Sequence, residues 1–540
     1  MMKNKITKLN ELTAIKAIVL FLVFFLVTLK VVAQEVTDSQ EIRLMPDEKW
    51  WGGAVWDGHM MPFSESYAIN LYGNNKGNQT QPLLLSNKGR VVWSESPISY
   101  TINDKVLSVS SFGSPIQLTS EGKTLKDAFF YASGNYFPPS GEHPGKLLFE
   151  RPQYNTWIEL IYNQNQNDIL KYANAIKSND FPTGAIMIDD NWQEDYGKWN
   201  FHTGRFKSPK MMIDSLHDMG FKVMLWVCPF VSPDCDVYRD LSTKGYFIKT
   251  AEGTDPLIVR WWNGASAVLD FTNPGAVDWF QGELDRLQAE YGVDGYKLDA
   301  GDTYFYDQPM TAYDTTATPN DHTLSFQQFG LRYPLNEYRA TWKMGGQPLA
   351  QRLHDKGHNW DDIQKLIPQI ALQGILGYPF NCPDMIGGGE YGSFINLKSV
   401  DQELIVRSAQ VHALMPMMQF SVAPWRVLDT DNLAAVKKAI ALRAEFLPKI
   451  LELLEVATKT GEPMVRMMEY EFPNQGYENV KDQFLLGDKI LVAPVLEKGA
   501  KERTVILPKG KWFYNGKEYR GGKTVKVPVT IADLPLFTKE

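Results

Sequence analysis

The 540-residue sequence predicts an α/β protein: a (β/α)8 barrel flanked by an N-terminal β-sandwich and a small C-terminal β-sandwich. Short apolar runs alternate with amphipathic helical stretches over residues 152–470, which is the pattern of a parallel sheet with crossover helices. Residues 34–151 and 471–540 consist instead of short extended runs broken by Gly, Asn, Ser and Pro, which is typical of antiparallel β-domains. Together with a leader at residues 1–33, these blocks account for the whole chain.

Residues 1–33 have the order of a signal peptide. Basic residues come first: Lys3, Lys5, Lys8 and Lys16. The thirteen uncharged residues Ala17 to Leu29 follow, and Val31-Val32-Ala33 then supplies a small-residue cleavage site. The apolar run is short for a membrane span, although an uncleaved anchor stays the alternative. We expect an exported mature protein, periplasmic or secreted, with no membrane contact in its mature form.

Six segments of the central block are the expected barrel strands with the residues that follow them. They are TWIELIY (156–162), GAIMIDD (184–190), FKVMLWVC (221–228), VDGYKLDAGD (293–302), PLAQRLHD (348–355) and YPFNCPD (378–384). An open doubly wound sheet is the alternative arrangement. No Gly-rich nucleotide fingerprint follows the first strand, so the barrel is favoured and no cofactor is expected.

The composition excludes several function classes. A net charge of −8 argues against nucleic acid or an anionic membrane as the main partner. The aromatic content of 12% suits either a carbohydrate-active protein or large aromatic β-cores. The sequence contains no signal for an oligomeric state.

Three cysteines are too few for a disulfide framework. A bridge between Cys228 and Cys235 stays open in an oxidising compartment, and Cys382 is the third. No CxxC pair exists, so a zinc site is not expected.

Acidic residues follow the expected barrel strands with unusual regularity, where barrel enzymes place their chemistry. They are Asp189, Asp190, Asp299, Asp302, Asp355 and Asp384. One such Asp is ordinarily a helix N-cap, but a set on one face indicates a site. Carboxylates with aromatic residues suit glycoside hydrolysis, which needs a nucleophile and an acid/base on opposite sides of the sugar. Clustered acids can also bind metal, but the tight DxDxD spacing is absent, so we expect no metal.

At these motifs the chain resembles glycoside hydrolase family 31, over the barrel and both sandwiches. VDGYKLDAGD resembles the nucleophile strand of the family, which implies that Asp299 attacks the anomeric carbon. The family's acid/base lies five residues before a Trp, and Trp360 therefore points to Asp355. Asp361 and Asp362 are rejected because they fall in the first turn of the next helix, where acids favour the helix dipole.

Within the family, DDNWQEDYG, LWVCPFV, VRWWNG, KLDAG and PDMIGG resemble the branch of bacterial α-galactosidases and the myogenesis-regulating glycosidase. The α-glucosidases of the family typically carry a WxDMNE-like nucleophile motif and a GDN acid/base motif. This chain has KLDAGD and LHDKG instead. Lys297 also occurs in the α-xylosidase branch, and Asp302 stands where related motifs often carry Glu.

The resemblance assigns further residues to substrate binding. Asp189, Asp190 and Asp384 are expected to accept hydrogen bonds from sugar hydroxyls. Lys297 and Arg352 are expected to donate to hydroxyls and to lower the pKa of neighbouring acids. The remaining expected contacts are Trp192 and Trp226 as pocket walls, Cys382 in the sugar pocket, and Asp302.

These residues together predict an exported retaining exo-α-glycosidase, with α-galactosidase as the expected activity. Its substrate would be an oligosaccharide or glycoside with a terminal α-linked sugar. An α-glucosidase or α-xylosidase of the same family, or a transglycosylase using the same intermediate, stays an alternative. A catalytically inactive sugar-binding relative is the alternative from another class, although both catalytic carboxylates are present.

Overall fold

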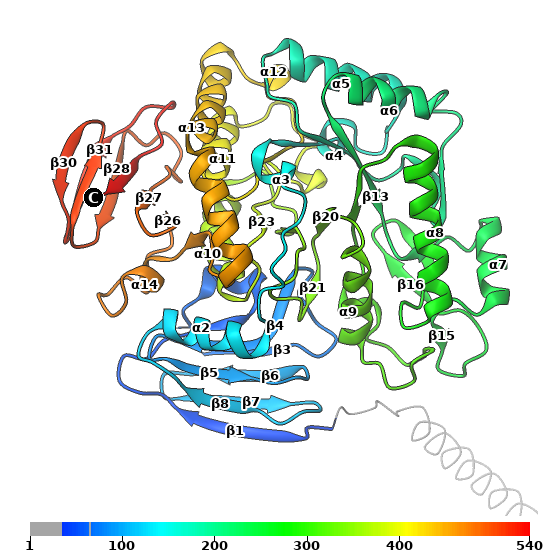
Figure 1. Cartoon of the computed structure of the whole chain (residues 1–540), viewed down its shortest axis with the longest axis horizontal. Helices are drawn as coiled ribbons and strands as arrows, with labels where there is room; N and C mark the ends of the chain where they lie inside the picture. Colours follow the sequence, from blue (N-terminus) through cyan, green and yellow to red (C-terminus); the bar gives the residue numbers. More distant parts are fainter. Residues whose placement is uncertain (1–34, 64–65) are drawn as a thin grey trace, which may run out of the picture.

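The computed structural model describes residues 35–63 and 66–540 (Figure 1). The predicted signal peptide, residues 1–33, lies outside the described residues. None of the helices within the described ranges is long and apolar enough to cross a membrane.

The N-terminal domain is built from two antiparallel sheets. One sheet has the order β1 (Asp38–Arg43), β7 (Val106–Ser111), β6 (Ile98–Ile102), β3 (Tyr67–Asn70). The other has the order β2 (Trp50–Ala54), β4 (Gln79–Ser86), β5 (Arg90–Trp93), β8 (Gln117–Ser120). Helix α2 (Leu125–Tyr136) packs on β4 and β5, and a capping box between Thr124 and Asp127 fixes its start.

Eight parallel strands form the predicted barrel. Their order is β23 (Asn381–Cys382), β22 (Gln351–Arg352), β20 (Leu335–Tyr338), β18 (Gly295–Leu298), β13 (Lys222–Val227), β10 (Ala185–Ile188), β9 (Gln153–Asn155) and β24 (Gln419–Phe420). A parallel bridge between Met385 and Gln419 joins the two ends of this order, with the amide of Ile386 2.8 Å from the carbonyl oxygen of Gln419. The sheet is therefore closed, which confirms the predicted barrel fold.

Helices lie around the outside of these strands (Figure 1). The main ones are α5 (Gln166–Ser178), α6 (Pro209–Asp218), α7 (Asp236–Lys244), α8 (Pro274–Tyr291), α9 (Pro319–Gly330), α10 (Trp360–Ile375), α11 (Gln402–Ala413) and α13 (Thr430–Thr460). Short helices are η1 (Val55–Met60), α3 (Leu147–Glu150), α4 (Trp157–Leu160), η2 (Thr303–Phe305), η3 (Tyr391–Ser393), α12 (Pro424–Val427) and α14 (Met468–Glu471). Loops carry β11 (Gln193–Asp195), β12 (Lys198–Phe201), β14 (Phe230–Val231), β15 (Lys249–Thr250), β16 (Ile258–Trp261), β17 (Gly264–Val268) and β19 (Met310–Thr311).

The prediction that TWIELIY (156–162) forms the first barrel strand is wrong. Residues Trp157–Leu160 of that segment form the short helix α4, and the strand is β9, immediately before it. A short apolar run fits a helix or a strand equally well, so its periodicity did not discriminate. The true strand is polar because it faces a polar barrel interior, where Gln153 accepts a hydrogen bond from Gln419 at 2.8 Å.

The C-terminal domain is a second, smaller β-domain with its own apolar core. Its larger sheet has the order β25 (Val465–Arg466), β26 (Phe484–Leu486), β27 (Ile490–Val492), β32 (Leu536–Lys539), β29 (Lys511–Tyr514), β30 (Lys517–Arg520). The smaller sheet pairs β28 (Glu502–Leu507) with β31 (Lys523–Pro528). The buried side chains of Leu485, Trp512 and Phe537 belong to the core of this domain.

The N-terminal domain is joined to the barrel by main-chain and side-chain bonds. Strand β21 (Thr341–Trp342), which belongs to the barrel block, pairs with β4. From β4, the buried amide of Gln79 reaches the main-chain oxygens of Arg339 and Arg352, each at 2.8 Å. Gln79 thereby binds the ends of two neighbouring barrel strands.

We expect Gln79→Ala to lower the free energy of unfolding by about 1–3 kcal/mol, because it removes a buried amide that donates to two carbonyl oxygens. Urea denaturation of the purified protein measures this change. The matched control is Gln117→Ala on the exposed strand β8. Equal stabilities of the two variants would contradict a structural role for the Gln79 amide.

Candidate active site

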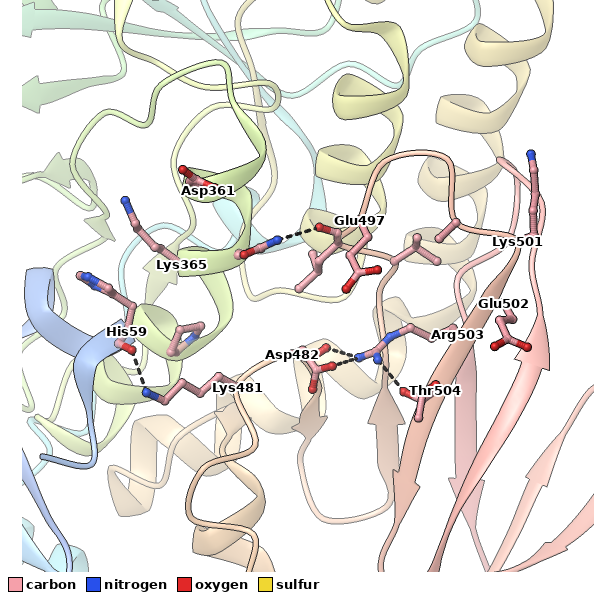
Figure 2. Close-up of a pocket in the computed structure, with 15 residues that line it drawn as sticks. His59, Asp361, Lys365, Lys481, Asp482, Glu497, Lys501, Glu502, Arg503 and Thr504 are labelled. Atoms are coloured by element: carbon pink, nitrogen blue, oxygen red, sulfur yellow. Dashed lines mark hydrogen bonds and ion pairs between the residues drawn. The ribbon is translucent and has the colours of Figure 1, made fainter. Parts of the chain in front are cut away.

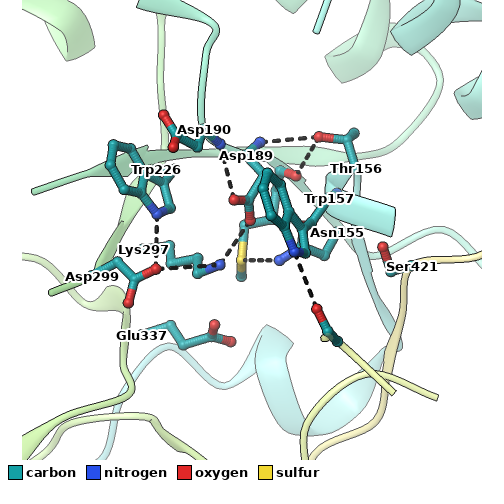
Figure 3. A network of polar contacts seen from close by, with 12 residues as sticks. Asn155, Thr156, Trp157, Asp189, Asp190, Trp226, Lys297, Asp299, Glu337 and Ser421 are labelled. Carbon is teal, nitrogen blue, oxygen red and sulfur yellow. Dashed lines mark hydrogen bonds and ion pairs between the residues drawn. The ribbon is translucent and has the colours of Figure 1, made fainter. Parts of the chain in front are cut away.

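A buried lysine connects two of the predicted site carboxylates, which follow the strands β10 and β18 on either side of β13 (Figure 3). Nζ of Lys297 lies 2.8 Å from Oδ2 of Asp189 and 3.9 Å from Oδ2 of Asp299. The indole Nε1 of Trp226 donates to the same Oδ2 of Asp299 at 2.9 Å. The structure therefore brings together four residues that the sequence predicted to share a site.

Arg339 is a site residue that the sequence analysis missed. Its Nε lies 3.2 Å from Oδ1 of Asp299, and its Nη2 lies 2.8 Å from Oδ2 of Asp302. It follows directly after β20, whose residues LNEY are too short and polar to be recognised as a strand. An arginine in the first position after a barrel strand was the signal that could have identified it.

The cations around Asp299 keep its carboxyl ionised. Burial by itself raises the pKa of Asp299, but Lys297, Arg339 and Arg352 outweigh burial and hold this pKa well below its usual range. The side chain is only 11% exposed, so few competing waters reach it. A charged, oriented carboxylate of this kind is suited to nucleophilic attack.

Arg352 forms the second centre of the site. Its Nη1 lies 2.7 Å from Oδ1 of Asp355 and 2.6 Å from Oδ1 of Asp384, while its Nε lies 3.1 Å from Oε1 of Glu337. Glu337 was not predicted, because it also lies on the polar strand β20. Arg352, Glu337 and Asp384 are buried, so this arginine compensates carboxylates that water cannot reach.

Asp355 differs from the other carboxylates in its exposure. Its side chain is 39% exposed. Within the described part of the chain, its Oδ1 accepts from Arg352 and no hydrogen bond reaches its Oδ2. Asp355 thus presents an oxygen toward solvent at the mouth of the barrel, whereas Asp299 lies deeper.

Asp190 is adjacent to Asp189 in the sequence, but its carboxylate accepts hydrogen bonds from polar groups and not from Lys297. Its Oδ1 accepts from the amide of Asn191 at 2.6 Å, and its Oδ2 accepts from the hydroxyl of Tyr196 at 3.2 Å and from the amide of Asn263. Burial raises the pKa of Asp190 to about 7. This carboxyl therefore carries less negative charge than Asp299 near neutral pH.

Two of the residues that were predicted to contact the sugar are completely enclosed by protein. Trp192 was expected to wall the pocket, but its indole is fully buried beside Phe201 and donates to the carbonyl oxygen of Trp226 at 2.8 Å. Cys382 was expected in the sugar pocket, but it is fully buried, with its sulfur 3.7 Å from the carbonyl oxygen of Asp384. Trp192 lies in the loop after β10, and Cys382 is paired in parallel register with Arg352, whose side chain contacts Glu337 inside the barrel.

Cys228, Cys235 and Cys382 are all free thiols and buried, so no bridge links the first two. In residues 35–63 and 66–540, no group of three or more His, Cys, Asp or Glu side chains is arranged to hold a metal ion.

Exposed aromatic residues stand at the mouth of the barrel, where the sequence analysis had not placed them. Trp262, at the tip of the β16–β17 hairpin, is 47% exposed, and the guanidinium of Arg339 lies 5.5 Å from its ring centre. Tyr304, two residues after Asp302, is equally exposed. Their position beside the nucleophile suits contact with a sugar ring.

A separate cavity of about 870 Å³ lies between η1, α10 and the C-terminal domain (Figure 2). Several charged side chains that line this cavity form ion pairs or hydrogen bonds with other groups of the protein. Arg503 pairs with Asp482 at 2.8 Å, and Nζ of Lys481 donates to the carbonyl oxygen of His59 at 2.8 Å. None of the predicted catalytic carboxylates lines it.

Comparison with known proteins agrees with this architecture. Residues 151–453 match the glycosyl hydrolases family 31 TIM-barrel domain, and residues 461–540 match the glycosyl hydrolase family 31 C-terminal domain. The chain is 36% identical to the myogenesis-regulating glycosidase of Mus musculus over 429 residues, covering 78% of this chain and 59% of that protein. It is 25% identical to alpha-glucosidase 2 of Bacillus thermoamyloliquefaciens over 410 residues, covering 70% and 51%.

Solved structures share the fold. The family 31 dextranase of Flavobacterium johnsoniae, complexed with glucose, superposes with a TM-score of 0.80 at 20% identity, covering 93% of this chain and 66% of that one. An α-xylosidase from a soil metagenome, complexed with xylose, gives a TM-score of 0.80 at 21% identity, covering 93% and 79%. A barrel with carboxylates at its carboxyl-terminal mouth is an arrangement that glycosidases use, and the family models with the 36% identical relative show that the chain belongs to glycoside hydrolase family 31. It spans between half and three fifths of the length of these two curated relatives.

We expect Arg339→Met to raise the pKa of Asp299, because it removes one of the cations that oppose burial. Asp299 must be ionised to attack, so the acid limb of the kcat/KM profile should move to higher pH, by about 1 unit or more. Rates measured across the acidic range test this shift. Arg332→Met, at an exposed arginine, is the control. An acid limb that stays in place in Arg339→Met would refute the electrostatic role.

Proposed function

We propose that this chain is an exported, retaining exo-α-glycosidase that acts on terminal α-linked galactose. The observation that carries the proposal is the contrast between its two catalytic carboxylates. Asp299 is buried and ionised by surrounding cations, whereas Asp355 is half-exposed with a free oxygen toward solvent. Retaining glycosidases need such a pair, with one nucleophile and one proton donor.

The proposed reaction proceeds by double displacement. Asp299 attacks the anomeric carbon while Asp355 gives its proton to the departing glycosidic oxygen, so the C–O bond breaks as the ester to Asp299 forms. Asp355, now ionised, takes a proton from a water molecule, which attacks the same carbon and releases Asp299. Two inversions retain the configuration of the sugar. Arg339 and Trp226 hold the two oxygens of Asp299 in one orientation throughout.

Galactose as the glycone is supported by the sequence motifs. DDNWQEDYG, LWVCPFV, VRWWNG, KLDAG and PDMIGG resemble the branch of bacterial α-galactosidases, and KLDAGD and LHDKG depart from the motifs of the family's α-glucosidases. Glucose and xylose are the competing glycones, since relatives of this chain include an α-glucosidase and an α-xylosidase. Export rests on the basic, apolar and small-residue order of residues 1–33.

We expect 4-nitrophenyl α-galactoside to be hydrolysed with a higher kcat/KM than the matched α-glucoside and α-xyloside. A difference of tenfold or more, about 1.4 kcal/mol in transition-state binding, would establish the glycone. The three initial rates are measured side by side, with Asp299→Asn as the background control. A preference for glucose or xylose would overturn the galactoside assignment. Inactivity on all three would favour the sugar-binding relative.

We expect Asp355→Asn to lose about 10²–10⁴-fold on a disaccharide, since a sugar leaving group needs a proton. The loss should be smaller for formation of the glycosyl-enzyme from a 4-nitrophenyl glycoside, whose leaving group is stable as an anion. Burst kinetics separate the two steps. Asp361→Asn, in the exposed first turn of α10, is the control. Equal losses on both substrates would argue against Asp355 as the acid.

A further inference from the structure

A chain of hydrogen bonds rises from the floor of the site to its rim through three separate segments. Asp190, after β10, is buried and accepts from the side-chain amide of Asn263 at the tip of the β16–β17 hairpin. The oxygen of that amide accepts from the hydroxyl of Tyr162 at 2.9 Å. Tyr162 follows α4 and is 40% exposed, so this Asp190–Asn263–Tyr162 bridge ends at the surface.

The bridge stands on the side of the barrel opposite the proposed acid/base. In the order of eight strands, β10 and β22 are four positions apart, which places them across the barrel from each other. Asp355 follows β22, and Asp190 follows β10. A leaving group that departs past Asp355 therefore lies on the far side of the sugar from the bridge. The bridge faces the non-reducing side of that sugar.

Aromatic packing supports the outer end of the bridge. The rings of Trp157, Tyr162 and Tyr391 contact one another, with centroids 5.4, 5.6 and 6.0 Å apart. Nε1 of Trp157 also donates to the carbonyl oxygen of Gly389 at 3.1 Å, which ties the cluster to the loop after β23. Three rings in mutual contact leave little room for a second sugar to pass between these loops.

The backbone beside Tyr162 is strained. Ile161 has φ of 49° and ψ of −122°, a conformation that a β-branched residue rarely adopts. Strain of this kind persists where the surrounding structure holds a residue in a functional position. Here it turns the chain so that the Tyr162 hydroxyl reaches the tip of the hairpin.

We propose that the hydrogen bond between Tyr162 and Asn263 determines the length of glycone that the enzyme accepts. By joining two loops over the non-reducing side of the pocket, it closes the space beyond the terminal sugar. The substrate class is therefore glycosides whose terminal sugar carries no further sugar. The inference rests on the proposed glycosidase function and adds to it the residues that exclude a longer glycone.

The test compares the first products from a 4-nitrophenyl α-glycoside of a disaccharide, built from the glycone that the substrate panel prefers. Wild-type protein should release the terminal monosaccharide first. In Tyr162→Ala, which removes ring and hydroxyl, the ratio of released disaccharide to monosaccharide should rise tenfold or more. Tyr162→Phe keeps the ring and removes only the hydroxyl, so its ratio should lie between the two.

Tyr313→Ala is the matched control, because Tyr313 is an exposed tyrosine outside the bridge. Its product ratio should equal that of wild type. An unchanged ratio in folded Tyr162→Ala, or disaccharide as the first product of wild type, would overturn the inference.

Failure of the proposed function is distinguishable from failure of the bridge. If no variant hydrolyses any aryl glycoside, the proposed activity fails, and calorimetric titration with the free monosaccharide and with its 4-O-methyl ether, which is extended only on the non-reducing side, still tests the bridge. Wild type should then bind the monosaccharide at least tenfold more tightly than the ether. Tyr162→Ala should reduce that preference, and an equal preference in both proteins would refute the bridge.

Discussion

The structure of this site depends on burying cations among carboxylates at the mouth of the barrel. Lys297, Arg339 and Arg352 are all withdrawn from water, and each would be very costly to bury without a partner. Lys297 is compensated by Asp189, Arg339 by Asp299 and Asp302, and Arg352 by Glu337, Asp355 and Asp384. Mutual compensation holds every carboxylate in one place before a sugar arrives, and such prior ordering is a main source of catalytic power.

The N-terminal sandwich is part of this arrangement. The carbonyl oxygen of Gly77 accepts from Nη1 of Arg339 at 2.6 Å, and Gln79 binds the main chain at the ends of β20 and β22. The orientation of the residues around Asp299 therefore depends on contacts with the N-terminal domain. The residues that make these contacts are separated by 260 to 273 positions in the sequence. Loops on the other half of the barrel mouth, after β9, β13 and β23, meet through Tyr162, Asn263 and Tyr391. The two halves of the site thus have separate supports.

Sequence reasoning located the elements whose pattern is local. Apolar strands such as β10 and β13 were recognisable, and so were the acids that follow them. It failed at β9 and β20, because strands that face a polar barrel interior have no apolar alternation to detect. Glu337 and Arg339 were missed for the same reason, since both belong to β20 or follow it. The complete burial of Trp192 and Cys382 was not predicted, because it depends on packing against segments that are distant in the sequence.

The sequence by itself determined the barrel with its two flanking β-domains, the family, and the motifs around Asp299 and Asp355. These follow from periodicity and from residues that are adjacent in the chain. Only the tertiary structure decided which cation faces which carboxylate, which indoles are buried, and which loops contact one another beside the site. Those properties arise from contacts between segments that lie up to several hundred residues apart. The direction and strength of a charge interaction depend on distance and burial, and neither quantity exists until the chain has folded.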